Sequence, residues 1–318
     1  MGRFSVRLSR VGAAFLLLTS CQSTKMKPMD DVLVMAYFTD ETAGLQLAYS
    51  YDSKSWKRIS RKASFYKPEQ GLYRDPFIQR SPDGDFIALW TTGWHGSEIG
   101  FSRSKDLLHW ESMQLLPLMK NIPDTANCWA PEWIYLQDQK KYLIFWSSTV
   151  TKIKKWNHRI YYSLTTDFKN FSPAQILFDP GFMVIDATMA KEKDKYYLFF
   201  KDERGGNEGI NSKGGMKAIH WVSSPNPTGP WSIPSDAIEG EIVSGYENAA
   251  EGPELISFAG KWNLFFDYYR KGKFGHMQAD KIEGPWEKLK WSHRMNYPAS
   301  HGSFLKIKFA ELEKLLND

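Results

Sequence analysis

Three carboxylates occupy the beginnings of short apolar segments that lie far apart in the chain: Asp75, Asp186 and Glu251. Two carboxyl groups, one ionised and one protonated, can together activate a water molecule and protonate a departing oxygen. Hydrolysis of a glycosidic bond with inversion needs such a pair roughly 6.5–9.5 Å apart, which leaves room for the water. A third negative charge nearby raises the pKa of the acid, so that it holds its proton near neutral pH. This chemistry is available only if the fold brings the three residues together.

One aromatic, apolar segment occurs five times in this chain of 318 residues. The copies are Val32–Phe38, Phe86–Trp90, Tyr142–Trp146, Tyr196–Phe200 and Trp262–Phe266. Each copy is followed by a segment that ends in a small residue and a turn leading to an aromatic, and these aromatics recur every 54–61 residues. Five even units of short strands and polar turns predict an all-β fold, a five-bladed β-propeller with four-stranded antiparallel blades around a central channel.

The innermost strand of each propeller blade lines the channel, and the element before each aromatic segment is the candidate for that strand. The five predicted inner strands begin at Arg74-Asp75-Pro76, Trp129-Ala130-Pro131, Ile185-Asp186-Ala187, Glu251-Gly252-Pro253 and His301-Gly302-Ser303. The last of them has no strands after it, and residues 32–56 have no inner strand before them. We therefore expect the two to join in one blade that ties the chain ends together. The helical spacing of Phe309, Leu312, Leu315 and Leu316 predicts a short docked helix at the end of the chain.

With these five motifs, in this order and spacing, the chain resembles glycoside hydrolase family 43 over residues 74–303. The resemblance implies a propeller enzyme that cleaves O-glycosidic bonds of furanose- or xylose-containing glycans with inversion. The implied activities are those of an α-L-arabinofuranosidase, a β-xylosidase or a galactofuranosidase, and the sequence does not choose among them. The resemblance also implies roles for the three carboxylates: Asp75 as general base, Glu251 as general acid and Asp186 as the residue that orients the acid and tunes its pKa.

Several neighbours of these motifs are candidates for binding the substrate. We expect Arg74, Trp129 and His301 to contact it, Arg74 either directly or as a partner of Asp75. Trp94 and Trp133 could also stack on a sugar ring, but tryptophan in a propeller more often belongs to the blade core. Glu132 and Glu254 follow two of the inner motifs, and strand alternation favours a structural role for both.

Two other functions stay open at this point. A non-catalytic glycan-binding propeller would keep the aromatic residues, but it would be expected to lose one of the three carboxylates. A propeller hydrolase with a histidine acid could use His301 or His95, although the Glu251 motif makes this less economical.

No cofactor is required for the expected hydrolysis. His301 matches a histidine that, in the family, often faces a hydrated ion or water, so we leave open a structural Ca²⁺ or other ion in the central channel, held indirectly. Calcium prefers oxygen ligands, and no His, Cys and Asp residues have zinc-like spacing. Cys128 precedes an apolar strand and is expected to be a small buried residue rather than a nucleophile.

The N-terminus has the three parts of an export signal: basic residues, the apolar stretch Val11–Leu18 and small residues before Cys21. Leu18-Thr19-Ser20-Cys21 resembles the bacterial lipobox, which predicts lipidation of Cys21. We therefore expect residues 1–20 to be a lipoprotein signal peptide, 21–31 a tether and 32–318 the catalytic propeller. Gln22 after the cysteine favours anchoring at the bacterial outer membrane, on its periplasmic or cell-surface face.

The charge of the chain bears on its partners. The formal net charge is +5, but Arg3, Arg7 and Arg10 lie in the predicted signal, so the mature chain is close to neutral. It has no basic stripe of the kind that nucleic-acid binding requires. We expect an oligo- or polysaccharide as the partner, no nucleic acid, membrane contact only through the N-terminal lipid anchor, and a monomer.

Overall fold

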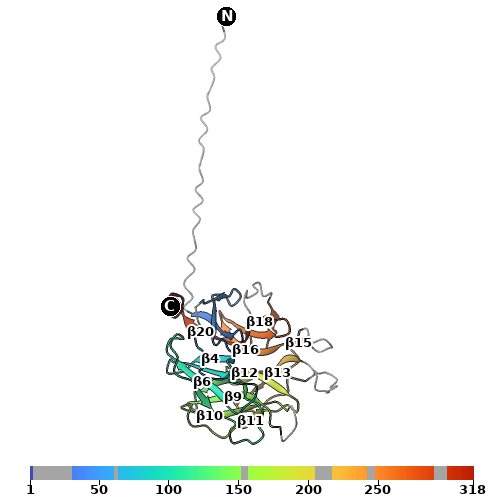
Figure 1. The fold of residues 1–318 in the computed structure, drawn as a ribbon. Coiled ribbons are helices and arrows are strands. Elements are labelled where there is room, and N and C mark those ends of the chain that lie inside the picture. The colour runs from blue at the N-terminus through green and yellow to red at the C-terminus, as the bar shows by residue number, and fades with distance from the viewer. Residues whose placement is uncertain (3–30, 61–63, 152–156, 205–216, 242–247, 290–298) are drawn as a thin grey trace.

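The structure is a computed structural model that describes residues 1–2, 31–60, 64–151, 157–204, 217–241, 248–289 and 299–318. Cys21 and nearly all of the predicted signal peptide and tether lie outside these residues. In the described part, twenty strands form five four-stranded antiparallel sheets, the blades of a propeller (Figure 1). The predicted fold class is confirmed.

The blades are numbered here by their order along the chain. Blade 1 contains β4 (Arg74–Arg80), β5 (Phe86–Thr91), β6 (Ile99–Ser104) and β7 (Gln114–Leu116). Blade 2 contains β8 (Trp129–Leu136), β9 (Lys141–Ser148), β10 (Arg159–Thr165) and β11 (Gln175–Phe178). Blade 3 contains β12 (Val184–Glu192), β13 (Lys195–Asp202), β14 (Lys217–Ser224) and β15 (Glu239–Glu241). Blade 4 contains β16 (Glu251–Phe258), β17 (Lys261–Tyr268), β18 (Lys273–Ala279) and β19 (Glu287–Lys288). Blade 5 contains β20 (Ser300–Lys308), β1 (Asp31–Phe38), β2 (Gln46–Ser50) and β3 (Lys57–Arg58).

The first strand of each blade belongs to a closed inner ring. Contacts link β4 to β8, β8 to β12, β12 to β16, β16 to β20 and β20 back to β4. Figure 1 shows β4, β12 and β16 near the middle of the molecule, with β10, β11 and β15 towards its periphery. All five predicted inner strands are therefore confirmed, and their first residues share one central axis.

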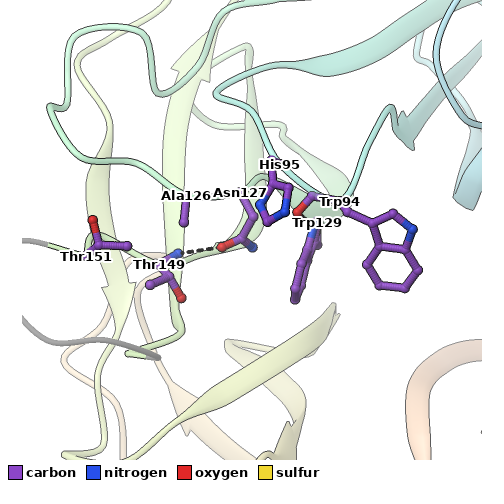
Figure 2. Close-up of a pocket in the computed structure, with 7 residues that line it drawn as sticks. All are labelled: Trp94, His95, Ala126, Asn127, Trp129, Thr149 and Thr151. Carbon is purple, nitrogen blue, oxygen red and sulfur yellow. Dashed lines mark hydrogen bonds between the residues drawn. The ribbon is translucent and has the colours of Figure 1, made fainter.

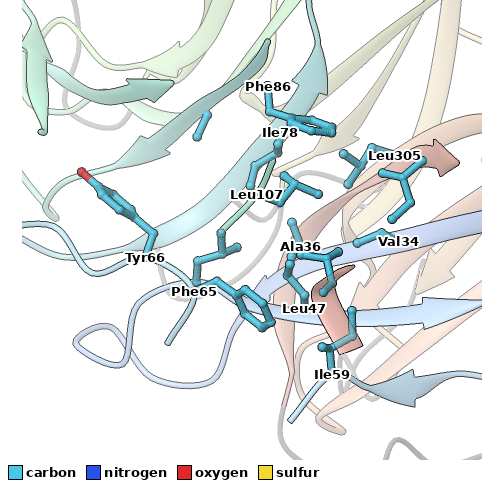
Figure 3. Close-up of a cluster of buried hydrophobic side chains, with 14 of the residues drawn as sticks. Val34, Ala36, Leu47, Ile59, Phe65, Tyr66, Ile78, Phe86, Leu107 and Leu305 are labelled. Carbon is cyan, nitrogen blue, oxygen red and sulfur yellow. The ribbon is translucent and has the colours of Figure 1, made fainter. Parts of the chain in front are cut away.

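The blades are held together by hydrophobic side chains between them. The buried hydrophobic residues of the described part form five clusters, and each cluster joins two neighbouring blades. In β9, Ile144 and Trp146 face the cluster shared with blade 1, whereas Leu143 and Phe145 face the one shared with blade 3. The second strand of a blade is thus apolar without alternation, because both of its faces are buried against neighbouring blades. Figure 3 shows the cluster between blades 5 and 1.

The predicted closure of the ring is also confirmed. In blade 5, β20 pairs antiparallel with β1 from Asp31–Lys308 to Phe38–Ser300, so the two ends of the propeller share one sheet. Helix α1 (Phe309–Asn317) follows β20 and buries Leu312 and Leu315, which lie on one helix face. Phe309 and Leu316 are exposed, unlike the docked face that the spacing predicted. Within the described residues, no helix is long and apolar enough to span a membrane.

Candidate active site

Four of the five inner strands begin with the same kink. The residues at these kinks are Asp75, Ala130, Asp186 and Gly252. Their φ angles are 47°, 45°, 51° and 57°, and each lies where the pairing register shifts. A positive φ is uncommon outside glycine, but aspartate tolerates it. Such a bulge bends the strand and re-aims its side chains, and bulges are frequent beside active sites. The kink therefore determines where the side chains at the mouth of each inner strand point.

A hydrogen bond to a hydroxyl group of the preceding blade holds two of these kinks in place. Thr91 in β5 accepts a bond from the Ala130 N–H (2.8 Å), and Ser147 in β9 accepts one from the Asp186 N–H (2.9 Å). Thr91 also donates to Asp75 Oδ2 (2.8 Å). Each hydroxyl residue is paired in register with the first residue of the inner strand of its own blade. Blades 1 and 2 thus use a neutral hydroxyl to fix the backbone of the following blade.

Blades 3 and 4 place charged residues at the same position, Lys201 in β13 and Asp267 in β17. Asp267 keeps the pattern, since its carboxyl group accepts a bond from the His301 N–H. Lys201 has no acceptor, and the Gly252 N–H bonds instead to Asp186 Oδ2 (3.3 Å). The Lys201 ammonium binds Glu251 Oε2 at 2.7 Å. Lys201 and Asp267 are both buried, with 2% and 4% of their surfaces exposed.

The three predicted catalytic carboxylates are brought together through His301. Its Nδ1 lies 3.6 Å from Asp75 Oδ1. Its ring packs on Gly252, because a Cβ at that glycine would lie 2.6 Å from His301 Cδ2. Gly252 is the neighbour of Glu251 and donates to Asp186. A chain of direct contacts therefore runs through the inner strands of blades 1, 5, 4 and 3.

The charges of this cluster shift one another's protonation. Burial, opposed by His301 and assisted by Glu251, raises the pKa of Asp186 to about 6. Burial and Glu251 raise the pKa of Asp267 to about 7. Burial alone would lower the pKa of His301, but the surrounding carboxylates, led by Asp186 and Asp75, outweigh it and raise this pKa. Two buried carboxyl groups at the axis therefore have pKa values raised towards neutral pH, and such shifted groups are frequent at functional sites.

A second pair of carboxyl groups, Glu132 of β8 and Glu254 of β16, lies buried beside this cluster. Their side chains are hydrogen-bonded to each other, which requires that one of them carries a proton. Burial and Glu254 raise the pKa of Glu132 well above its ordinary value, and burial raises that of Glu254 to about 8. Both residues interact with groups of the cluster, Glu132 with Asp186 and Glu254 with His301.

A pocket of about 590 Å³ is formed by residues of blades 1 and 2 and of the loops beside their strands (Figure 2). Its lining residues are Trp94, His95, Ala126, Asn127, Trp129, Thr149 and Thr151. Its volume lies within the range of small-ligand sites. Trp94 is half exposed and stands edge-on to Trp129, with ring centroids 6.0 Å apart.

Two of the three predicted binding residues, Trp129 and Arg74, lie at or near this pocket. Trp129 lines it and donates from Nε1 to the Trp94 carbonyl (3.2 Å). The Arg74 guanidinium lies 4.1 Å from the Trp94 ring centroid and pairs with Glu41 at 2.6 Å, whereas Asp75 is 3.9 Å away. His301 belongs to the carboxylate cluster instead. Trp133 is buried in the core between blades 1 and 2.

Lys201 and Asp267 were not predicted as residues of the cluster at the axis. Trp94 was considered as a possible sugar contact, with the blade core favoured, and its side chain is half exposed. Lys201 and Asp267 directly follow two copies of the repeated aromatic segment, where the other copies are followed by Thr91 and Ser147. Alignment of the copies would have shown a charged residue in two places where two others have a hydroxyl. Cys128 is buried, and burial raises the pKa of its thiol to about 12, as expected for an unreactive residue.

Among the described residues, no three His, Cys, Asp or Glu side chains are arranged to hold a metal ion. His301, for which an indirect role in holding an ion was left open, has carboxylates and a glycine as its neighbours.

The chain is similar in sequence and in structure to several known proteins. Over 235 residues the chain is 26% identical to the alpha-L-arabinofuranosidase of Bifidobacterium longum subsp. longum; the match covers 60% of this chain and 21% of that protein. The chain thus spans about a fifth of the length of this curated relative. Among solved structures, a thermostable family-43 glycoside hydrolase has a TM-score of 0.57 at 20% identity, covering 72% of this chain and 78% of that one. An arabinanase of Bacillus subtilis has a TM-score of 0.54 at 15% identity, covering 76% and 88%.

At these identities the structural matches show a shared propeller fold. The family is shown by a separate match that extends over nearly the whole described propeller. Residues 31–313 match the family described as "probable glycosyl hydrolase domain", a relative of glycosyl hydrolase family 43, and the chain belongs to this family.

Proposed function

We propose that this chain is a glycoside hydrolase that cleaves furanosides or xylosides with inversion of the anomeric centre. One observation carries the proposal: contacts through His301 and Gly252 link Asp75, Glu251 and Asp186 at the mouths of the inner strands. These are carboxyl groups of the number and type that the reaction needs, and they come from three different blades.

In the proposed reaction, Asp75 takes a proton from the attacking water, and Glu251 gives a proton to the departing glycosidic oxygen. Thr91 donates to Asp75 Oδ2 and so fixes the orientation of the base. Asp186 accepts the Gly252 N–H and thereby holds the peptide next to Glu251. This contact supports its role as the residue that orients the acid.

The pocket supports binding of a sugar. Trp94 presents an exposed aromatic surface, and the apolar face of a sugar ring can pack on such a surface. Arg74, Trp129 and His301 are the other proposed substrate contacts. The name of the curated relative favours an α-L-arabinofuranoside, and we propose this sugar ahead of a β-xyloside or a galactofuranoside.

The test is a panel of 4-nitrophenyl glycosides with the wild type and Glu251→Gln. The panel contains the α-L-arabinofuranoside, the β-D-xyloside and the β-D-galactofuranoside, together with arabino- and xylo-oligosaccharides. We expect cleavage of at least one furanoside or xyloside, with the inverted anomer appearing first by NMR. A folded wild type that binds these sugars but cleaves none would favour the alternative, a glycan-binding propeller.

We also propose that the mature chain begins at Cys21, carries lipid there and acts as a monomer at the bacterial outer membrane. The motif Leu18-Thr19-Ser20-Cys21 supports the anchor. We expect Cys21→Ala to abolish incorporation of labelled palmitate and to release the protein from the membrane fraction. Labelling that persists in Cys21→Ala would contradict this assignment. Sedimentation of the chain without residues 1–21 tests the monomer.

A further inference from the structure

Lys201 occupies a position that the repeated fold does not require to be charged. The corresponding residues of blades 1 and 2 are Thr91 and Ser147, whose hydroxyl groups bind the backbone of the next blade. Lys201 is only 2% exposed, and its ammonium lies 2.7 Å from Glu251 Oε2 and 2.9 Å from Glu203 Oε2. Burial of an ammonium group is unfavourable unless it is paired, so a lysine here calls for an explanation beyond the packing of the blades.

The pairing of Lys201 keeps it charged. Burial alone would lower its pKa, but Glu251 and Glu203 outweigh this effect and raise the pKa well above its ordinary value. Glu203 is also bound by Lys217, whose ammonium contacts both the side chain and the carbonyl oxygen of Glu203 (2.9 Å to the carbonyl). Two ammonium groups and two carboxylates thus form one balanced row that ends at Glu251. The row places a fixed cation on one oxygen of that carboxyl group.

We propose that Lys201 is a positioning residue for the acid of this glycosidase. The inference rests on the proposed function, in which Glu251 supplies the proton. With Oε2 held by Lys201, the transferable proton is carried by Oε1, and a protonated carboxyl group still accepts the bond from Lys201 through Oε2. As the bond between the anomeric carbon and the glycosidic oxygen breaks, its electron pair stays on that oxygen, which takes the Oε1 proton. Water attacks the carbon and loses its proton to Asp75, and solvent later reprotonates Glu251.

The positive charge of Lys201 offsets the negative charges of the carboxylates around it. The titratable groups that interact with Lys201 from the elements around it are Glu251, Glu203, Asp186, Asp267, Tyr269 and His158. His301 and Asp267 also interact electrostatically with Glu251. Without Lys201, Asp186 and Asp267 would face Glu251 with no ammonium group on its carboxyl. An ammonium group beside a carboxyl group favours its ionised form, so we expect removal of Lys201 to extend acid-dependent activity to higher pH. The Glu251 carboxyl group would also be free to rotate.

The test compares Lys201→Met with Lys201→Arg on phenyl and 4-nitrophenyl glycosides of a sugar that the wild type cleaves. The phenyl leaving group depends more on acid assistance than the 4-nitrophenyl group does. We expect Lys201→Met to lower kcat/KM about 10- to 100-fold on the phenyl glycoside and less than about threefold on the 4-nitrophenyl glycoside. The alkaline limb of its kcat/KM profile should move to higher pH. Lys201→Arg should keep the limb near that of the wild type.

The matched control is Lys217→Met, which removes an ammonium group from Glu203 without touching Glu251. It should leave both the ratio between the two substrates and the alkaline limb unchanged. The ratio between the two substrates comes from one preparation at one pH, so it does not depend on the folded fraction even if Lys201→Met is unstable. Equal loss on the two substrates with an unmoved limb would overturn the positioning role. A wild type that cleaves no glycoside at all would overturn the proposed function and this inference with it, which is a distinguishable result.

Discussion

Two pairs of blades, 1 and 2 (the neutral half) and 3 and 4 (the charged half), place different residues beside the start of their inner strands. In blades 1 and 2, Thr91 and Ser147 bind the backbone of the next blade with a neutral hydroxyl group. In blades 3 and 4, Lys201 and Asp267 occupy the same position, and both are buried and charged or titratable. The comparison teaches that the fold does not require a charged residue at this position. Where the chain places a buried charged or titratable group there instead, that group interacts with Glu251.

The halves also divide the work of the site. The exposed aromatic surface of Trp94 and the pocket beside it belong to blades 1 and 2. The cluster of Asp186, Lys201, Glu251 and Asp267 belongs to blades 3 and 4. Asp75 is the exception, since it lies on the neutral half and is bound by Thr91. Substrate contacts and proton transfer are therefore expected to respond to different substitutions.

The largest expected effect separates Asp75 from Glu251. Asp75→Asn should lower kcat by at least about 10²-fold on every substrate, because activation of water is needed whatever the leaving group. Glu251→Gln should lose as much on poor leaving groups but be partly spared on 4-nitrophenyl glycosides. Steady-state kinetics on both substrate types measures this, with circular dichroism to check folding. Equal loss in Glu251→Gln on all substrates counts against its role as the acid.

Next in size is the removal of a hydroxyl group from the neutral half. Thr91→Val leaves the Ala130 N–H unsatisfied and removes the donor to Asp75, so we expect a loss of about 1–3 kcal/mol in the free energy of unfolding. Activity should also fall, because the base loses a fixed orientation. Urea denaturation and kcat/KM measure the two effects. Thr91→Ser keeps the hydroxyl and is the control; if it behaves like Thr91→Val, the hydrogen bonds are not the cause.

A smaller effect is expected at the pocket. Trp94→Ala removes an exposed aromatic face, worth about 0.5–1.5 kcal/mol in stacking, which corresponds to a rise in KM of about two- to tenfold with kcat nearly unchanged. Trp94→Phe should retain most of the affinity. Initial-rate kinetics on an oligosaccharide separates KM from kcat. A loss confined to kcat would place Trp94 outside substrate binding.

The smallest expected effect is a pH trend in stability. The pKa of Glu254 is about 8 in the folded protein against an ordinary value of 4.5, so the folded state binds the proton more tightly. Its contribution to stability is complete below pH 4.5 and is lost as the pH rises towards 8. Buried His158 and His276 have lowered pKa values of about 4 and about 3, and they act in the opposite direction only below about pH 6.5.

Between pH 6.5 and 8 we therefore expect the free energy of unfolding to fall with rising pH, by at most about 1.4 kcal/mol per pH unit for one group. Glu254→Gln should make this slope shallower, whereas Glu283→Gln, an exposed carboxylate in an outer turn, should not. Chemical denaturation at several pH values gives the slope. A slope unchanged in Glu254→Gln would mean that the Glu132–Glu254 pair holds no proton in this range.

Much of this arrangement could be predicted, because it depends on segments that repeat along the chain and on the residues directly before them. Five aromatic segments at even spacing predict five blades, and the residue types before them predict the inner strands that carry Asp75, Asp186 and Glu251. The contribution of Lys201 was not predicted, because its partner Glu251 lies 50 positions away on another blade. Glu132 and Glu254 were assigned structural roles, and nothing in their own strands indicates that their carboxyl groups meet. Lipidation of Cys21 stays a prediction.

By itself, then, the sequence determined the number of blades, the closure of the ring and the identity of the residues at its mouth. The three features follow from the periodicity of the chain and from the need to bury apolar strands on both faces. Each blade meets that need by packing against its two nearest neighbours. Only the tertiary structure decided which charges face one another across the ring, because strands that are distant in the chain meet at the axis. Protonation and orientation depend on those contacts, since a buried carboxyl group responds to whichever charge lies a few ångströms away.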